Sequence, residues 1–160
     1  MGDAMGPLKT VPAFQDYLAT LGDKPIMGVL IGTGLTMLIQ SSAAIIGILQ
    51  GLYAGHLLDL QGSIPILLGS NIDTCITAVL AAIDSNIAAK RVAGAHVLFN
   101  VVVTVLFMIL LVPFTSLMQW MEVHFKLTPA MTVAFAHGTF NITNTILLFP
   151  FIGTLAFVVT

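Results

Sequence analysis

Residues 36–43 read Thr-Met-Leu-Ile-Gln-Ser-Ser-Ala, and they lie at the centre of a run from Pro25 to Leu58 that contains no Asp, Glu, Lys or Arg. A helix over this whole run would be about 50 Å long, whereas the hydrocarbon core of a bilayer is about 30 Å thick. The polar triplet, Gln40-Ser41-Ser42, divides the run into two arms that are each slightly short of a full span. We therefore predict a re-entrant helical hairpin over residues 25–58 with the polar triplet at its buried tip.

The composition is typical of a membrane protein. Of the 160 residues, 58% are hydrophobic and 8% are charged, whereas about a quarter are charged in an ordinary soluble domain. Residues 92–121 and 127–160 are two further runs without a charged residue, and each is longer than the roughly 20 apolar residues that cross a bilayer. The formal net charge of -2 leaves no basic surface for nucleic acid. We predict a single all-α integral membrane domain.

The rest of the chain divides into one interfacial helix and three membrane segments. We expect the interfacial helix over residues 1–24, a discontinuous helix over residues 60–85, and membrane helices over residues 88–121 and 128–160. Pro65 and Gly69 loosen the discontinuous helix, so its break is expected at Gly69-Ser70-Asn71. Pro113 is expected to interrupt the following helix. Lys90-Arg91 favours the cytoplasmic side for the loop before it, and Lys24 is expected on the same side.

The polar triplet is the first candidate site. Polar side chains and unwound backbone are tolerated at mid-membrane depth where they line a watery cavity or are buried in protein. Gln40 offers an amide, both serines offer hydroxyl groups, and Thr36 lies one helical turn earlier on the same face. Hard cations bind several oxygen atoms, whereas an oxyanion binds hydroxyl, amide and backbone N–H donors. The alternative is that these side chains only hydrogen-bond their own helix or a neighbour.

A second polar cluster follows Gly69 and adds a carboxylate. Its members are Ser70, Asn71, Asp73, Thr74 and Thr77. An ionisable group inside a membrane segment is costly, so Asp73 is a functional candidate that could bind a cation or exchange a proton. Alternatively, Asp73 starts a helix at an aqueous interface.

The pattern Ala-His-x-x-Phe-Asn occurs twice, with His96 and Asn100 in the first copy and His137 and Asn141 in the second. Each His and Asn share one helix face, so they could orient a binding loop or hydrogen-bond another helix. Neither copy has the cysteine or glutamate needed to complete a zinc site. Because no nucleophile with a base is visible either, we predict that the protein is not an enzyme.

Four motifs, in this order, resemble the type II sodium/phosphate cotransporters, including their bacterial members. They are Thr36-x-x-x-Gln40-Ser41-Ser42-Ala43, Gly69-Ser70-Asn71-Ile72-Asp73-Thr74, Ala88-Ala89-Lys90-Arg91 and Ala-His-x-x-Phe-Asn. The resemblance implies a sodium-driven phosphate transporter of two inverted repeats, each with a Gln-Ser-Ser loop at a central site. Broken helices that meet at the membrane midplane are a general transporter plan.

The resemblance also implies roles for individual residues. Phosphate would be bound by Gln40, Ser41, Ser42, Asn71 and Thr74. Sodium would be bound by the same five residues together with Thr36, Asp73 and Thr77. The supporting residues would be His96, Asn100, His137 and Asn141. Ala43 replaces the third serine of the usual Gln-Ser-Ser-Ser, while Asp73 and Cys75 replace Gly and Thr of Asn-Ile-Gly-Thr-Thr, and these departures bear on substrate affinity and ion stoichiometry.

The chain has one Gln-Ser-Ser copy where the family has two. Either the sequence is one repeat of a longer transporter, or two antiparallel copies form a homodimer; the abrupt ends favour a fragment. We expect a multi-pass protein of a cell membrane, such as a bacterial inner membrane. Its partners would be inorganic phosphate and lipid, and sodium would be co-transported with no organic cofactor. The alternatives are a regulatory or scaffold protein without transport, and sodium-coupled transport of another small anion.

Overall fold

The computed structural model describes residue 20 and residues 24–151, and this part of the chain contains helices and no strand. The elements are α2 (Pro25–Ile39), α3 (Ser42–Ala54), α4 (Leu60–Ala82), α5 (Ile87–Ile109), α6 (Leu111–Phe125), α7 (Pro129–Leu148) and the 3-10 helix η2 (Phe149–Phe151). The all-α prediction is confirmed. The interfacial helix predicted over residues 1–24 lies outside the described residues, apart from Thr20 and Lys24.

Side-chain caps explain where three of the helices begin. A cap side chain accepts a hydrogen bond from one of the first backbone N–H groups, which have no partner within the helix. The caps are Asp59 to the Gly62 nitrogen at 2.7 Å, Asn86 to the Ala89 nitrogen at 2.9 Å and Thr128 to the Met131 nitrogen at 3.3 Å. Short polar residues at the loops therefore divide an apolar chain into separate helices.

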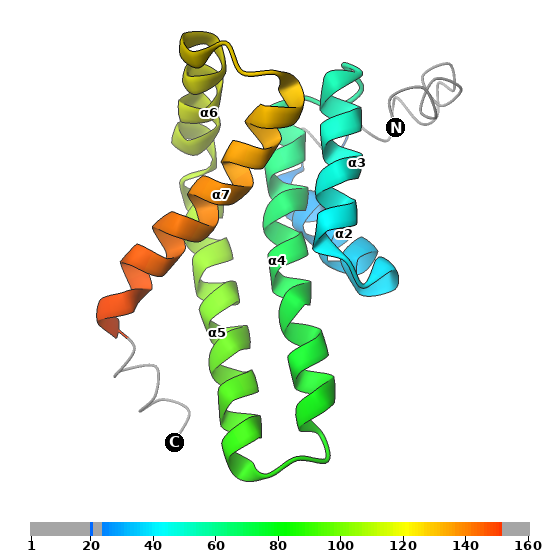
Figure 1. Ribbon diagram of the computed structural model, residues 1–160, viewed down its shortest axis with the longest axis vertical. Helices are drawn as coiled ribbons and strands as arrows, with labels where there is room; N and C mark the ends of the chain where they lie inside the picture. Colours follow the sequence, from blue (N-terminus) through cyan, green and yellow to red (C-terminus); the bar gives the residue numbers. More distant parts are fainter. Residues whose placement is uncertain (1–19, 21–23, 152–160) are drawn as a thin grey trace.

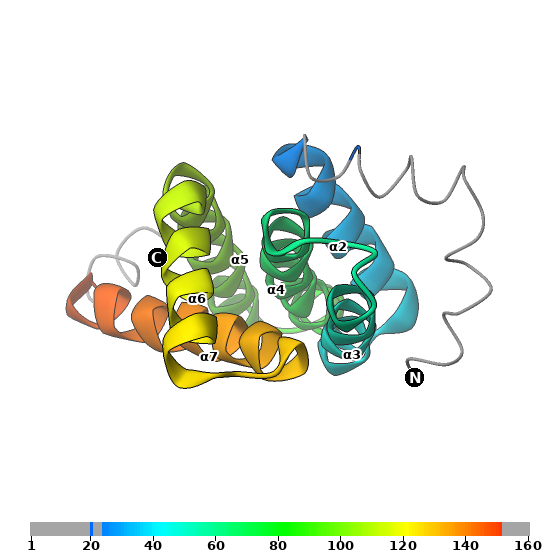
Figure 2. The same cartoon turned by 90° about the horizontal axis from the view of Figure 1, so that it is seen from above.

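Helix α4 is the centre of the molecule. Seen from above, α2 and α3 lie on one side of it and α5 and α6 on the other, while α7 crosses obliquely (Figure 2). The contact between α4 and α2 is the most extensive of any helix pair. Two hydrogen bonds attach α3 to the other side: Tyr53 Oη donates to Glu122 Oε2 at 2.6 Å, and Gln50 Nε2 donates to the Ala130 carbonyl oxygen at 3.0 Å.

Helices α2 and α3 form a hairpin that reaches only partway along α4. The hairpin begins at Pro25 and returns to the end of α4 where Leu60 lies, and its tip is beside the middle of α4 (Figure 1). Gly28 contacts Pro65, near the beginning of α4, so Lys24 lies at the opposite end of α4 from Lys90. This arrangement is contrary to the expectation that the two lysines share a side.

The structure differs from the prediction of a discontinuous helix over residues 60–85. Helix α4 runs without a break from Leu60 to Ala82, through Gly69-Ser70-Asn71 and past Pro65. Pro65 is in the second turn, so its ring meets the carbonyl of Gln61 close to the helix start, where there is little preceding helix to disrupt. Gly69 does not break the helix. Because it has no side chain, it allows α2 to pack closely against α4.

The predicted interruption near Pro113 is confirmed at Leu110. Helix α5 ends at Ile109 and α6 begins at Leu111, with Leu110 at φ -90° and ψ 14° between them. A proline ring clashes with the carbonyl four residues earlier, and the residue four before Pro113 is Ile109. Pro113 itself is in the first turn of α6, where its missing N–H has no cost.

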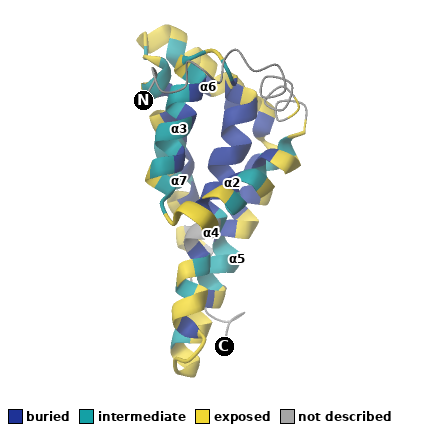
Figure 3. Ribbon diagram, turned by 90° about the vertical axis from the view of Figure 1, so that its right-hand side faces the viewer, coloured by how far each residue is buried: buried dark blue, intermediate teal, exposed yellow. Residues whose placement is uncertain are grey.

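The buried core and the exposed apolar surface occupy different parts of the molecule. Core side chains from α3, α4, α6 and α7, such as Ile45, Leu67, Met118 and Phe140, are at most 1% exposed, and the buried positions gather in the half of the molecule that holds these helices (Figure 3). Helix α5 exposes Ile87, Val92, Val101, Val102, Val105 and Ile109. Among the described helices, α4 and α5 are long and apolar enough to cross a membrane.

Candidate functional site

The polar triplet forms the turn at the tip of the α2–α3 hairpin. Gln40 ends α2 in the left-handed region, with φ 57° and ψ 30°, and its backbone N–H donates to the Thr36 carbonyl oxygen at 2.6 Å. Ser41 is extended and caps α3, because its Oγ accepts from the Ala44 nitrogen at 3.2 Å. The predicted break at the polar triplet is therefore real, and it is built from the triplet's own side chains.

The tip brings two helix ends of opposite polarity together. The last carbonyl groups of α2 and the first N–H groups of α3 have no partners within their helices, and the helix dipoles make the first group negative and the second positive. Gln40 is exposed and donates Nε2 to the Met37 carbonyl oxygen at 2.9 Å, while Ser41 and Ser42 are half-buried. One turn thus offers acceptors for a cation and donors for an oxyanion.

Glycines on both helices allow α2 and α4 to cross at close range. A Cβ added at Gly32 would overlap the carbonyl oxygen of Ile66, and one added at Gly69 would overlap that of Val29. Thr33 Oγ1 bridges the crossing, because it donates to the Val29 carbonyl oxygen at 2.9 Å and to the Gly69 carbonyl oxygen at 3.0 Å. Backbone atoms of both helices are therefore in direct contact.

This crossing places the first and second predicted clusters at the same level of the molecule. Thr36 is buried one turn beyond Gly32 and donates to the Gly32 carbonyl oxygen at 2.8 Å. Asn71 is buried two residues beyond Gly69 and donates Nδ2 to the Leu67 carbonyl oxygen at 3.1 Å. Within the described residues, no hydrogen bond joins Asn71 to the polar triplet.

The other members of the second cluster continue along α4. Ser70 is buried and donates to the Leu67 carbonyl oxygen at 2.7 Å, and Thr77 is exposed. Asp73 and Thr74 belong to the same continuous helix, although their side chains lie outside the described part. Asp73 is therefore in the fourth turn of α4, and the alternative that it starts a helix is wrong.

The two His/Asn pairs make the same local hydrogen bond. Asn100 Nδ2 donates to the His96 carbonyl oxygen at 3.0 Å, and Asn141 Nδ2 donates to the His137 carbonyl oxygen at 2.9 Å. The i to i+4 spacing on a helix favours this bond, which satisfies each amide within its own helix. The His96 carbonyl also accepts from Cys75 Sγ at 3.4 Å, so Cys75 joins α4 to α5 at the first His/Asn pair.

Sequence reasoning missed three buried oxygen atoms that have no hydrogen-bond partner among the described residues. They belong to Ser63 on α4, Thr104 on α5 and Asn144 on α7. Thr104 and Asn144 each lie about one turn from the contact between Phe107 and Phe140, whose ring centroids are 4.7 Å apart. Asn144 lies among other polar residues of the last uncharged run, and this position was the only feature of the sequence that could have identified it. Buried oxygen atoms of this kind require water, an ion or another polar group.

Comparison with known proteins identifies a family whose model matches most of this chain. The Na+/Pi-cotransporter family model matches residues 8–127. The uncharacterized protein YqeW of Bacillus subtilis is 37% identical over 145 residues, which are 91% of this chain and 46% of that relative. Sodium-dependent phosphate transport protein 2C of Mus musculus is 41% identical over 78 residues, covering 46% of this chain and 13% of the relative.

The name of a further relative refers to the export of phosphate. "Putative inorganic phosphate export protein YjbB" of Escherichia coli is 24% identical over 153 residues, covering 96% of this chain and 27% of the relative. The chain thus spans less than half the length of these curated relatives. No solved structure matches it. Because the family model covers most of the chain, this apolar helical protein is a membrane protein that belongs to the Na+/Pi-cotransporter family.

Proposed function

We propose that the chain is one repeat of a sodium-coupled phosphate symporter and carries half of the substrate site at the tip of the α2–α3 hairpin. The observation that supports this most is the position of the polar triplet. It stands between the carbonyl end of α2 and the N–H end of α3, beside the middle of a helix long enough to cross a membrane. Polar groups at mid-membrane depth are tolerated where they are buried in protein or line a watery cavity, and the exposed Gln40 amide fits the second case.

The dimensions of the hairpin favour a re-entrant segment. With 15 residues in α2 and 13 in α3, the arms are about 22 and 20 Å long, which is less than a hydrocarbon core of about 30 Å. The hairpin also begins and ends at the same end of α4. We infer that it enters and leaves on one side of the membrane and holds the polar triplet inside.

Sodium and phosphate would occupy this tip together. Ser41, Ser42 and the first N–H groups of α3 would bind phosphate, while the Gln40 amide oxygen and the last carbonyls of α2 would bind sodium. Thr36, Asn71, Asp73, Thr74 and Thr77 would complete the ion site from α2 and α4, and the His/Asn pairs would support it. The cation offsets the charge of the anion in a medium of low dielectric constant. The other half of the site would come from a second repeat or an antiparallel second copy.

Transport by the full-length protein in proteoliposomes tests the proposal. Radiolabelled phosphate uptake should require an inward sodium gradient, and Gln40→Ala should reduce it about tenfold or more, because the ion would lose an oxygen ligand whose contribution is about that of a hydrogen bond to a charged group. Gln119→Ala, an exposed glutamine on α6, should leave uptake unchanged. Equal uptake in sodium and potassium would refute the coupling, and full activity of Gln40→Ala would refute the site.

The direction of transport and the identity of the transported anion are tested by two further measurements. The name of YjbB refers to phosphate export, so phosphate-loaded vesicles should also be assayed for efflux. Competition by sulfate or arsenate tests another small anion as the substrate. A scaffold without transport predicts no heat of phosphate binding with or without sodium, whereas the symporter predicts that sodium strengthens phosphate binding.

A further inference from the structure

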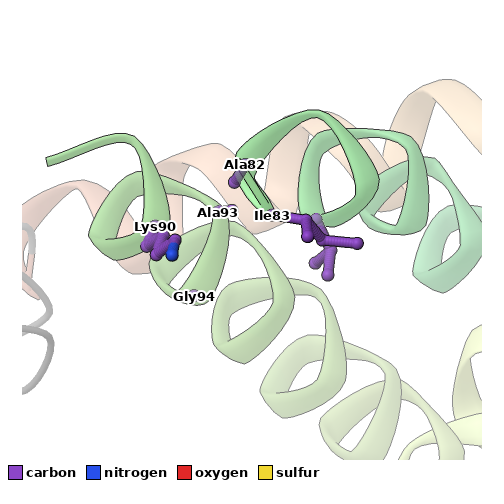
Figure 4. A pocket seen from close by; sticks show the side chains of 6 residues that line it. Ala82, Ile83, Lys90, Ala93 and Gly94 are labelled. Atoms are coloured by element: carbon purple, nitrogen blue, oxygen red, sulfur yellow. The ribbon is translucent and has the colours of Figure 1, made fainter. Parts of the chain in front are cut away.

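A hollow between α4 and α5 lies at the other end of α4, away from the proposed transport site. The α4–α5 pocket has a volume of about 430 Å³ and is lined by Val79, Ala82 and Ile83 from α4 and by Lys90, Ala93 and Gly94 from α5. Figure 4 shows the α5 residues facing the end of α4. Volumes of about 300 to 1,000 Å³ are usual for sites that hold a small molecule.

Small side chains create the pocket. Ala82 and Ala93 are 6% and 5% exposed, and they form the floor of the pocket. A Cβ added at Gly94 would meet no atom within 4 Å, so the space beside it is empty. Val79 and Ile83 are exposed apolar walls. The pocket therefore offers an apolar slot that is open to the surroundings.

One cation stands at the edge of this slot. Lys90 is exposed, and its side chain makes no hydrogen bond or ion pair to any residue in the described part of the chain. Arg91 follows it, and Asp84 is the one acidic residue of the adjoining loop. The end of the α4–α5 hairpin thus carries two basic groups and one acidic group beside an apolar hollow.

We propose that the α4–α5 pocket binds an anionic phospholipid, with its phosphate group at Lys90 and an acyl chain along Val79, Ile83 and Gly94. Helices α4 and α5 are the two candidate spans, so their shared end lies at the level of lipid headgroups. Basic residues on the cytoplasmic side attract anionic lipid, and basic pockets between membrane helices bind such headgroups. A free phosphate ion would find a single charged donor and apolar walls, which suits it poorly.

Thermal unfolding of the full-length protein in detergent, titrated with phosphatidylglycerol or phosphatidylcholine, tests this assignment. Phosphatidylglycerol should raise Tm at lower concentration than phosphatidylcholine. Lys90→Gln should weaken the phosphatidylglycerol effect about fivefold, the usual contribution of one basic residue. Lys126→Gln, an exposed lysine beyond α6, is the matched control and should leave the titration unchanged.

Gly94→Leu distinguishes this pocket from the rest of the surface. Because an added Cβ at position 94 meets no atom within 4 Å, leucine should occupy the hollow and abolish the difference between the two lipids, while Tm without lipid stays the same or rises through helix propensity. A lipid preference that survives both Lys90→Gln and Gly94→Leu would overturn the proposal. So would a Tm increase by inorganic phosphate that Lys90→Gln removes, or a loss of Tm in lipid-free Gly94→Leu, which would mean that protein fills the pocket. The assay does not depend on transport, so its failure leaves the symport proposal intact.

Discussion

Gln40 holds a backbone conformation that glutamine seldom adopts. Its φ of 57° is in the left-handed region, where the Cβ of an L residue crowds the following carbonyl oxygen. Glycine is the usual residue at this position of a helix end because it lacks a Cβ. A glutamine there is less stable than a glycine, which is consistent with a functional use of its amide.

We therefore predict opposite effects of Gln40→Gly on stability and on transport. Relief of the left-handed strain should raise the free energy of unfolding by about 1 kcal/mol, as measured by thermal or denaturant unfolding. Loss of the amide should abolish sodium-dependent phosphate uptake. Lys126 has φ 51°, so Lys126→Gly is the control that should gain stability and keep uptake. A transporting Gln40→Gly protein would contradict the proposed role of the side chain.

At the scale of helices, the α2–α4 contact depends on which glycines face the partner. Gly32 and Gly34 are two residues apart on α2, but only Gly32 lies against α4, where an added Cβ would overlap the Ile66 carbonyl oxygen. An added Cβ at Gly34 would meet nothing within 4 Å. The structure therefore identifies which of the two glycines serves helix packing.

Gly32→Ala and Gly34→Ala should thus have different effects. Gly32→Ala should lower the free energy of unfolding by about 1 to 3 kcal/mol, because the backbones must separate, and should break the Thr33 bridge to Gly69. Gly34→Ala should leave stability unchanged or raise it by up to about 1 kcal/mol through helix propensity. Denaturant unfolding of the two variants in the same detergent provides the comparison; equal effects would mean that α2 does not rest on α4 as described.

At the scale of the whole molecule, the relation between α4 and the hairpin sets the topology. If α4 spans the membrane, its length of 23 residues, about 34 Å, separates Lys24 and His56 at one end from the loop around Ser85 at the other. The positive-inside tendency of Lys90-Arg91 favours a cytoplasmic position for that loop.

Cysteine labelling in intact cells tests this topology. In a Cys75→Ala background, Lys24→Cys and His56→Cys should both react with a membrane-impermeant maleimide added from outside, and Ser85→Cys should react only after the membrane is permeabilised. Residues 24 and 56 labelled from opposite sides would show that residues 25–54 cross the membrane completely. In the protein without substitutions, Cys75 is buried and 1% exposed. That protein should not react with the maleimide and serves as the unreactive control.

Much of the architecture follows from residue types alone. The long uncharged run that starts at residue 92 predicted a membrane helix, and α5, which extends into that run, is a candidate span. The break at Gln40-Ser41-Ser42 was predictable because a glutamine and two serines in an apolar run form a turn and a helix cap locally. Pro113 likewise ends a helix through its own ring. These effects act within four residues along the chain, so they can be recognised without a partner.

Tertiary structure decided the features that need a neighbouring helix. Gly69 looked like a helix breaker, yet α4 continues through it, and the carbonyl of Val29 and the backbone nitrogen of Thr33 occupy the space that the missing Cβ leaves. The α4–α5 pocket had no signal in the sequence, since an alanine or glycine leaves a hollow only when the facing residues are also small. Periodicity describes which side chains share a face, whereas only packing determines which face meets α4 and which space stays empty.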